Sequence, residues 1–155
     1  MWLTPRSPRV RDRFSRIGNV LLVTDPAAVV EQLLGSMSSH DQTVEAIASL
    51  TTEDLVWSNT GLPDAAGREA VLAFVDGMHS GMGASGLKVD ILNIAANGNV
   101  VLTERVDRFL NADGVEFLSV DVMGTFEVRD GKVCAWRDYF DLAGFMARMQ
   151  AALGG

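Results

Sequence analysis

The sequence contains a single cysteine, Cys134, and only two histidines, His40 and His79, among its 155 residues. One cysteine cannot form an internal disulfide, and neither histidine stands at a metal-ligand spacing from the other or from the cysteine. No apolar run approaches the roughly 20 residues of a membrane-spanning helix, and the stretch 20–23 is too short for the core of a signal peptide. The sequence therefore predicts a cytoplasmic protein without a bound metal or a membrane segment.

Positive charge is also scarce. Lysine and arginine total 13 against 20 aspartates and glutamates, which gives a formal net charge of −7. Proteins that bind nucleic acid or anionic membranes need a basic surface, so this balance disfavours both partners and suits a neutral or apolar small molecule. With 48% hydrophobic residues, a chain of this length can bury a sizeable core in one domain.

The first 24 residues differ in composition from the rest, because they hold five arginines and one aspartate. We interpret residues 1–24 as a disordered basic extension, and a targeting or anion-binding arm is the alternative. The folded domain is expected to occupy residues 25–155, since Asp25 followed by Pro26 is a typical start of a helix.

The spacing of apolar residues predicts helices first and strands afterwards. Helices are expected from Pro26, over about 44–50 and over about 68–78, with a short strand at 55–59. Four extended segments are predicted at about 87–95, 100–110, 115–128 and 132–140, joined by the turns Asn97-Gly98, Asp113-Gly114 and Asp130-Gly131. Asp141 then begins a final helix. Helices packed over the concave face of a curved, mixed but mostly antiparallel sheet form an α+β cone around a ligand-sized cavity.

Charged residues gather on two of the predicted strands. Residues two apart in a strand share a face, so Arg105 and Asp107 are neighbours on one surface. The same rule places together Cys134, Trp136, Asp138 and Phe140. A carboxylate between two aromatic side chains is costly in a core unless it is paired, and Arg105 is the expected partner of Asp138. A purely structural ion-pair network would explain the same pattern.

Two motifs on these strands carry a resemblance to a known family. Thr103-Glu-Arg-Val-Asp107 and Trp136-Arg-Asp-Tyr-Phe-Asp141, in this order, resemble the limonene-1,2-epoxide hydrolase family. The similarity continues through Glu53-Asp-Leu-Val-Trp-Ser-Asn59, Leu62-Pro63 and Gly67-Arg68, and covers about residues 25–150. It implies the cone fold of nuclear transport factor-like proteins and ketosteroid isomerase, no metal or organic cofactor, and a homodimer.

The resemblance also implies a role for each site residue. Asp138 matches the base that deprotonates water, Asp107 the acid that protonates the epoxide oxygen, and Arg105 the residue that links them. Asn59 matches a residue that helps to position the water. Chemistry agrees, because opening an epoxide requires a nucleophile on carbon and a proton for the departing oxygen. The implied reaction hydrolyses a hydrophobic epoxide to a vicinal diol in one step, without a covalent intermediate.

Trp57 departs from the family, whose usual residue at this position is a tyrosine that holds the attacking water. An indole only donates a hydrogen bond, whereas a phenol also accepts one. Trp57 shares a strand face with Asn59, which favours a place in the site, and a core aromatic facing away from the site is the alternative. The substitution is expected to narrow the cavity and to weaken, alter or abolish the activity.

Apolar residues of several elements are expected to line the substrate pocket. They are Val75, Met78, Leu87, Val120, Val122, Trp136, Phe140 and Phe145. Ordinary core packing is the alternative for each of them. Glu116 and Asp121 are expected on the outer face of the sheet or in a dimer contact, and His79 in a loop.

Two other functions fit the same pattern. A cone with a pair of acids can move protons beside a carbonyl, as in a ketosteroid isomerase or a polyketide cyclase. A protein that only binds a small hydrophobic ligand, its water site lost through Trp57, is the second alternative.

Overall fold

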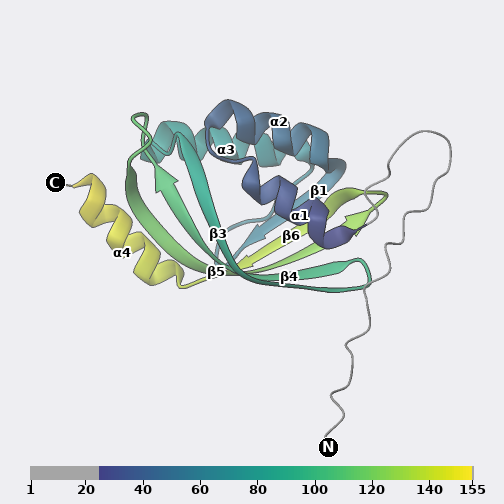
Figure 1. The fold of residues 1–155 in the computed structure, drawn as a ribbon. Coiled ribbons are helices and arrows are strands. Elements are labelled where there is room, and N and C mark those ends of the chain that lie inside the picture. Colours follow the sequence, from purple (N-terminus) through teal and green to yellow (C-terminus); the bar gives the residue numbers. More distant parts are fainter. Residues whose placement is uncertain (1–24, 155) are drawn as a thin grey trace, which may run out of the picture.

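The computed structural model describes residues 25–154 (Figure 1). The predicted extension at residues 1–24 lies outside this range. The described elements are, in chain order, α1 (Pro26–Gly35), α2 (His40–Leu50), β1 (Thr51–Asn59), β2 (Ala65–Ala66), α3 (Arg68–Met82), β3 (Gly86–Asn97), β4 (Val100–Leu110), β5 (Glu116–Arg129), β6 (Lys132–Tyr139) and α4 (Leu142–Leu153). Helices precede a run of long strands, and one helix ends the chain, as the periodicity predicts.

The strands form one mixed sheet in the order β2-β1-β6-β5-β4-β3. All neighbours are antiparallel except β1 and β6, which run parallel. The three connections between β3 and β6 turn at glycines with positive φ, namely 61° at Gly98, 73° at Gly114 and 75° at Gly131, a conformation that glycine adopts without strain. The parallel pairing sets Asn59 opposite Asp138 and Trp57 opposite Trp136.

Figure 1 shows α1, α2 and α3 lying over the concave face of the curved sheet. The main core lies between these layers and includes Val30, Leu33, Ile47 and Phe126, all with 0% of their surface exposed. Side chains cap α1 and α4 as expected, since Asp25 accepts from the N–H of Ala27 and Asp141 from that of Gly144. The predicted α+β cone is confirmed.

Strand β4 alternates between the two faces of the sheet as the period of two predicts. Thr103, Arg105 and Asp107 are buried, whereas Leu102 and Glu104 are exposed. This alternation directs the charged pair toward the concave side, where the helices cover it.

Strand β6 does not follow the predicted alternation throughout. The register with β5 shifts between Glu127 and Val128, so Val133 is buried while Cys134 is only partly buried. Cys134 was therefore wrongly grouped with Trp136, because a bulge adds one residue and turns the chain over.

Two boundaries also differ from the prediction. Strand β1 starts at Thr51 rather than near Leu55, and α3 continues to Met82. His79 consequently lies in α3 and not in a loop, and its ring centroid is 4.5 Å from that of His40. Glycines within α3 suggested an early end, but the helix stops only at Gly83, whose φ of 71° is left-handed.

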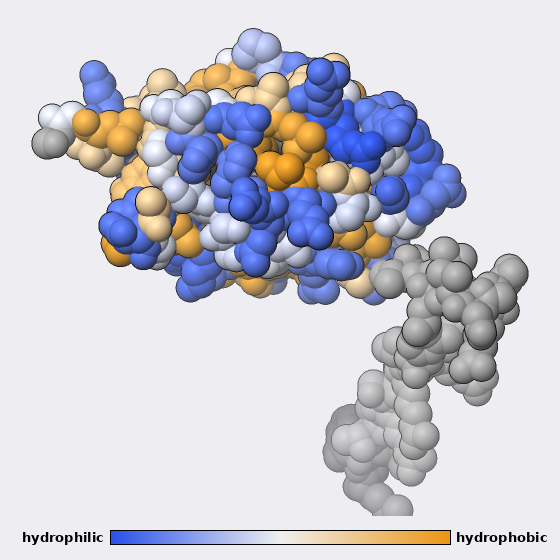
Figure 2. All heavy atoms as spheres, turned by 90° about the horizontal axis from the view of Figure 1, so that it is seen from above, coloured by the Kyte–Doolittle hydropathy of each residue, from blue (hydrophilic) through white to orange (hydrophobic). Residues whose placement is uncertain are grey.

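Figure 2, which looks down on the helix layer, shows a mainly hydrophilic surface with apolar residues gathered near its centre. No helix within residues 25–154 combines the length and the apolar character that crossing a bilayer demands.

Candidate active site

A cavity of about 490 Å³, partly open to solvent, lies between α3, α4 and the concave face of the sheet. Its wall combines apolar side chains with two carboxylates and one amide. The lining residues are Trp57, Asn59, Leu62, Phe74, Met78, Leu87, Asp107, Phe109, Val120, Val122, Asp138, Phe140 and Phe145. Its polar groups converge from β1, β4 and β6.

Arg105 lies beneath the cavity, with 0% of its side chain exposed. Its Nε donates to Oδ1 of Asp107 at 2.8 Å, and one terminal nitrogen donates to Oδ2 of Asp107 at 3.1 Å. The same terminal nitrogen is 2.8 Å from Oδ1 of Asp138. One guanidinium therefore holds two carboxylates at fixed positions beside the cavity.

The other terminal nitrogen of Arg105 donates to the hydroxyl of Thr103 at 3.2 Å. Space for this nitrogen comes from Gly124 on β5, which pairs with Thr103 on one side and Asp138 on the other. A Cβ on Gly124 would collide with this nitrogen and lie 2.7 Å from the Thr103 hydroxyl oxygen. Neither residue was predicted as part of the site, although the place of Thr103, two residues before Arg105, was a usable signal.

Asp138 accepts hydrogen bonds from two tryptophans as well as from Arg105. The Trp136 indole N–H donates to Oδ1 at 2.9 Å, and the Trp57 indole N–H donates to Oδ2 at 3.2 Å. The two indole rings are stacked, with centroids 4.2 Å apart and an interplanar angle of 17°. Trp57 therefore faces the site and contacts the carboxylate itself.

The two carboxylates differ in their surroundings, and the pKa of Asp107 is raised above its usual value. Burial is the main cause, and it outweighs the opposing effect of Arg105, while the charge of Asp138 raises the value further. For Arg105, burial alone would lower the pKa, but the charges of Asp138 and Asp107 raise it above its usual value. Asp107 therefore retains a proton at a higher pH than an ordinary aspartate does.

Within residues 25–154 no group of three or more histidine, cysteine, aspartate or glutamate side chains is arranged to hold a metal ion. The two carboxylates of the cavity are instead joined through Arg105.

Comparisons with known proteins match the chain to a family. Residues 24–151 match the model of the limonene-1,2-epoxide hydrolase catalytic domain. Epoxide hydrolase EphG of Mycobacterium tuberculosis is 36% identical over 115 residues, which are 73% of this chain and 71% of that protein. The chain belongs to the limonene-1,2-epoxide hydrolase family. Membership supports epoxide hydrolysis in general as its activity.

Solved structures agree with this family at the level of fold. An M. tuberculosis epoxide hydrolase described as LEH-like matches with a TM-score of 0.64 and 30% identity, over 83% of this chain and 92% of that one. A SnoaL-like polyketide cyclase from Jannaschia sp. matches with a TM-score of 0.68 but only 17% identity, over 88% of this chain and 99% of that one. The second likeness concerns the cone fold alone.

Most of the residues that the sequence suggested for the epoxide hydrolase pocket lie on the cavity wall. Those that line it are Met78, Leu87, Val120, Val122, Phe140 and Phe145. Val75 instead lines a smaller neighbouring cavity of about 290 Å³. Trp136 is 2% exposed and stands behind Asp138. Both corrections arise because packing between layers, and not strand or helix periodicity, decides which side chains reach the surface of the cavity.

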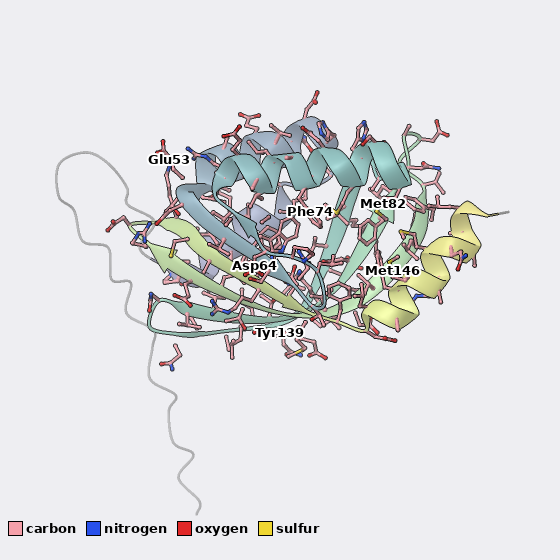
Figure 3. All side chains as sticks on the ribbon, turned by 180° about the vertical axis from the view of Figure 1, so that it is seen from behind. Glu53, Asp64, Phe74, Met82, Tyr139 and Met146 are labelled. Atoms are coloured by element: carbon pink, nitrogen blue, oxygen red, sulfur yellow. The ribbon has the colours of Figure 1, made fainter. Side chains whose placement is uncertain are left out.

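Three residues that line the cavity were not predicted from the sequence as part of the pocket. Phe109 follows Asp107 by two residues on β4, and Phe74 precedes Met78 by one helical turn on α3, so periodicity provided a signal for both. Figure 3 shows Phe74 directed from α3 toward the sheet. Leu62 lies in the turn after β1, where no periodic pattern exists.

Proposed function

We propose that the protein is a cofactor-independent epoxide hydrolase that adds water to a hydrophobic epoxide and releases a vicinal diol. The observation that carries the proposal is the pair of carboxylates, Asp107 and Asp138, which share one buried arginine and both line a cavity whose wall is mostly apolar. An acid and a base within one mostly apolar site suit a reaction that needs a proton for the departing oxygen and a base for the water.

Asp107 is the proposed acid. Its raised pKa favours the protonated form at a pH where an ordinary aspartate is ionised. That proton is available to the epoxide oxygen as the carbon–oxygen bond breaks. The two donors from Arg105 hold the carboxyl group in one orientation, which is the positioning that acid catalysis requires.

Asp138 is the proposed base, and Asn59 the proposed holder of water. Water attacks one epoxide carbon through its oxygen and gives a proton to Asp138, while the other carbon keeps the former epoxide oxygen as a hydroxyl. The register supports this arrangement, because Asn59 lies opposite Asp138 on the neighbouring strand and both line the cavity. No ester with the enzyme forms, and a proton returns from Asp138 to Asp107 before the next turnover.

A panel of epoxides in heavy-oxygen water tests the proposal. The wild-type protein should release a diol that carries one heavy oxygen, and Asp107→Asn and Asp138→Asn should each abolish its formation. Asp121→Asn is the matched control, because Asp121 is an exposed aspartate of β5 outside the cavity. Proton exchange on a ketone without diol formation would instead indicate an isomerase, and ligand binding without turnover a binding protein.

We also propose that the protein is a cytoplasmic homodimer, as the family resemblance implies. Leu102, Met123 and Tyr139 are 50% to 55% exposed on strands β4, β5 and β6, and Met123 pairs directly with Tyr139. Light scattering during size-exclusion chromatography should give twice the mass of one chain. A monomeric mass that persists at high protein concentration would contradict the dimer.

A further inference from the structure

Asp138, the proposed base, accepts hydrogen bonds from three different side chains. Oδ1 of Asp138 receives Arg105 and Trp136, and Oδ2 receives Trp57. A carboxylate offers about four lone pairs, two on each oxygen. Among the described residues these three donors leave one lone pair, on Oδ2, for the proton of the attacking water.

The Trp57 hydrogen bond acts against transfer of that proton. An N–H···O bond to an ionised oxygen is roughly twice as strong as one between neutral groups, so the bond from Trp57 weakens as Oδ2 becomes protonated. Interactions that are stronger before the transition state than within it slow the step. Trp57 therefore delays the removal of a proton from water.

The indole cannot readily turn away from Oδ2. It is stacked on Trp136, and its other side meets the ring of Phe74 edge-on, with centroids 5.2 Å apart. Only 6% of Trp57 is exposed. No phenol replaces it, because the single tyrosine of the chain, Tyr139, lies on the outer side of the sheet, away from Phe74 (Figure 3).

The cavity wall is suited to stabilise the epoxide carbon that the water attacks. Five aromatic side chains line it: Trp57, Phe74, Phe109, Phe140 and Phe145. Aromatic faces carry partial negative charge and stabilise positive charge in a desolvated setting. A wall of this kind can stabilise a carbon that becomes partly positive.

We propose that Trp57 makes this site selective for epoxides whose reacting carbon tolerates positive charge, namely aryl-substituted, allylic or tertiary epoxides. The inference rests on the proposed function. The carbon–oxygen bond breaks first, toward the proton of Asp107, and the water oxygen then bonds to the more substituted carbon. The water proton passes last to Oδ2 of Asp138, so one water and one epoxide give one diol.

Styrene oxides with different para substituents test the inference in the wild-type protein. We expect kcat/KM to rise by about tenfold or more from para-nitro to para-methoxy. Hydrolysis in heavy-oxygen water should place the label on the benzylic carbon, which mass spectrometry of the diol fragments identifies. A label on the terminal carbon, or rates that do not rise with electron donation, would overturn the inference while hydrolysis itself remained. Failure to hydrolyse any epoxide would overturn the proposed function instead.

The variant Trp57→Phe isolates the N–H, because it keeps an aromatic ring and removes the donor to Oδ2. Its hydrolysis of 1,2-epoxyhexane should increase relative to that of styrene oxide, and the dependence of kcat/KM on the para substituent should weaken. Phe109→Leu is the control, since Phe109 lines the cavity but packs on Phe117 and Phe145 rather than on Trp57, so the change alters the aromatic wall and leaves the Trp57 hydrogen bond. If both variants gain equally in hydrolysis of 1,2-epoxyhexane relative to styrene oxide, the effect arises from cavity volume and the inference is overturned. If Trp57→Phe does not fold, the position of the label in the wild-type product decides alone.

Discussion

At the scale of single residues, Asp107 and Asp138 are the same amino acid in two different environments. Asp107 receives both of its observed donors from Arg105, whereas Asp138 receives Arg105 and two indoles. Burial raises the pKa of Asp107 above its ordinary value. A difference in environment thus assigns different proposed roles to chemically identical groups.

Catalysis should depend on pH through Asp107. Because its pKa is raised, the acid is present at low and moderate pH and is lost as pH rises through that value, so kcat/KM should fall there. A pH profile with a fast-reacting epoxide measures this basic limb. A rate that stays level over the whole pH range in which the protein remains folded would argue against Asp107 as the acid.

The same group makes a signed contribution to stability. The folded-state pKa of Asp107 lies above its ordinary value of 3.8, so its contribution is fully present below that value and is lost as pH rises through the folded-state pKa. The free energy of unfolding of the wild type should therefore decrease relative to that of Asp107→Asn over this interval. Urea titrations at several pH values measure this difference in the free energy of unfolding. A difference between the two proteins that is the same at every pH would contradict the prediction.

At the scale of secondary-structure elements, three neighbouring strands build the proposed catalytic group. Strands β4 and β6 carry the charged residues, and β5 lies between them and contributes Gly124. A side chain at this position would occupy the place of the Arg105 terminal nitrogen. The glycine is needed for space rather than for a special backbone angle, since it lies within a regular strand.

Gly124→Ala should therefore displace Arg105 and lower kcat on the order of 100-fold, as misplaced catalytic groups do. Overpacking of this kind also destabilises by about 1–3 kcal/mol. Gly35→Ala is a suitable control, because a Cβ there has no neighbour within 4 Å. Steady-state kinetics and urea denaturation measure both effects, and retention of full activity in Gly124→Ala would show that Arg105 tolerates displacement.

At the scale of the whole molecule, the apolar side chains form two clusters, and residues of the cavity wall dominate only the buried part of the smaller one. The larger one joins α1, α2 and α3 to the sheet. The smaller one, formed by Phe109, Leu118, Val120 and Val122, receives Phe140 and Phe145 and borders the cavity. Stability and the shape of the pocket are therefore partly separable.

Leu33→Ala should destabilise the fold without changing the chemistry. Leu33 is fully buried in the larger cluster and does not line the cavity, so its truncation should lower the free energy of unfolding by about 2–5 kcal/mol. Thermal or urea unfolding measures this, and kcat/KM below the transition should equal that of wild type. Val115→Ala, at a site 58% exposed, is the control and should change stability by less than about 0.5 kcal/mol.

The sequence by itself determined the local order of the molecule and part of its site. Period-two alternation assigned Arg105 and Asp107 to one face, and the glycine turns fixed the order of the long strands, because both features depend on near neighbours in the chain. Cys134 was misplaced where a bulge interrupted that alternation. Family motifs, and not periodicity, assigned chemical roles to the charged residues.

Only the tertiary structure decided which distant residues meet. The parallel pairing of β1 with β6 brings Trp57 and Asn59 beside Asp138, and no local pattern specifies the partner of an isolated strand. Packing between layers selected Phe74 and Leu62 for the cavity wall and placed Trp136 behind Asp138. These contacts depend on how elements far apart in the chain pack together. The periodicity of the sequence indicates only which face of its own strand or helix a side chain occupies.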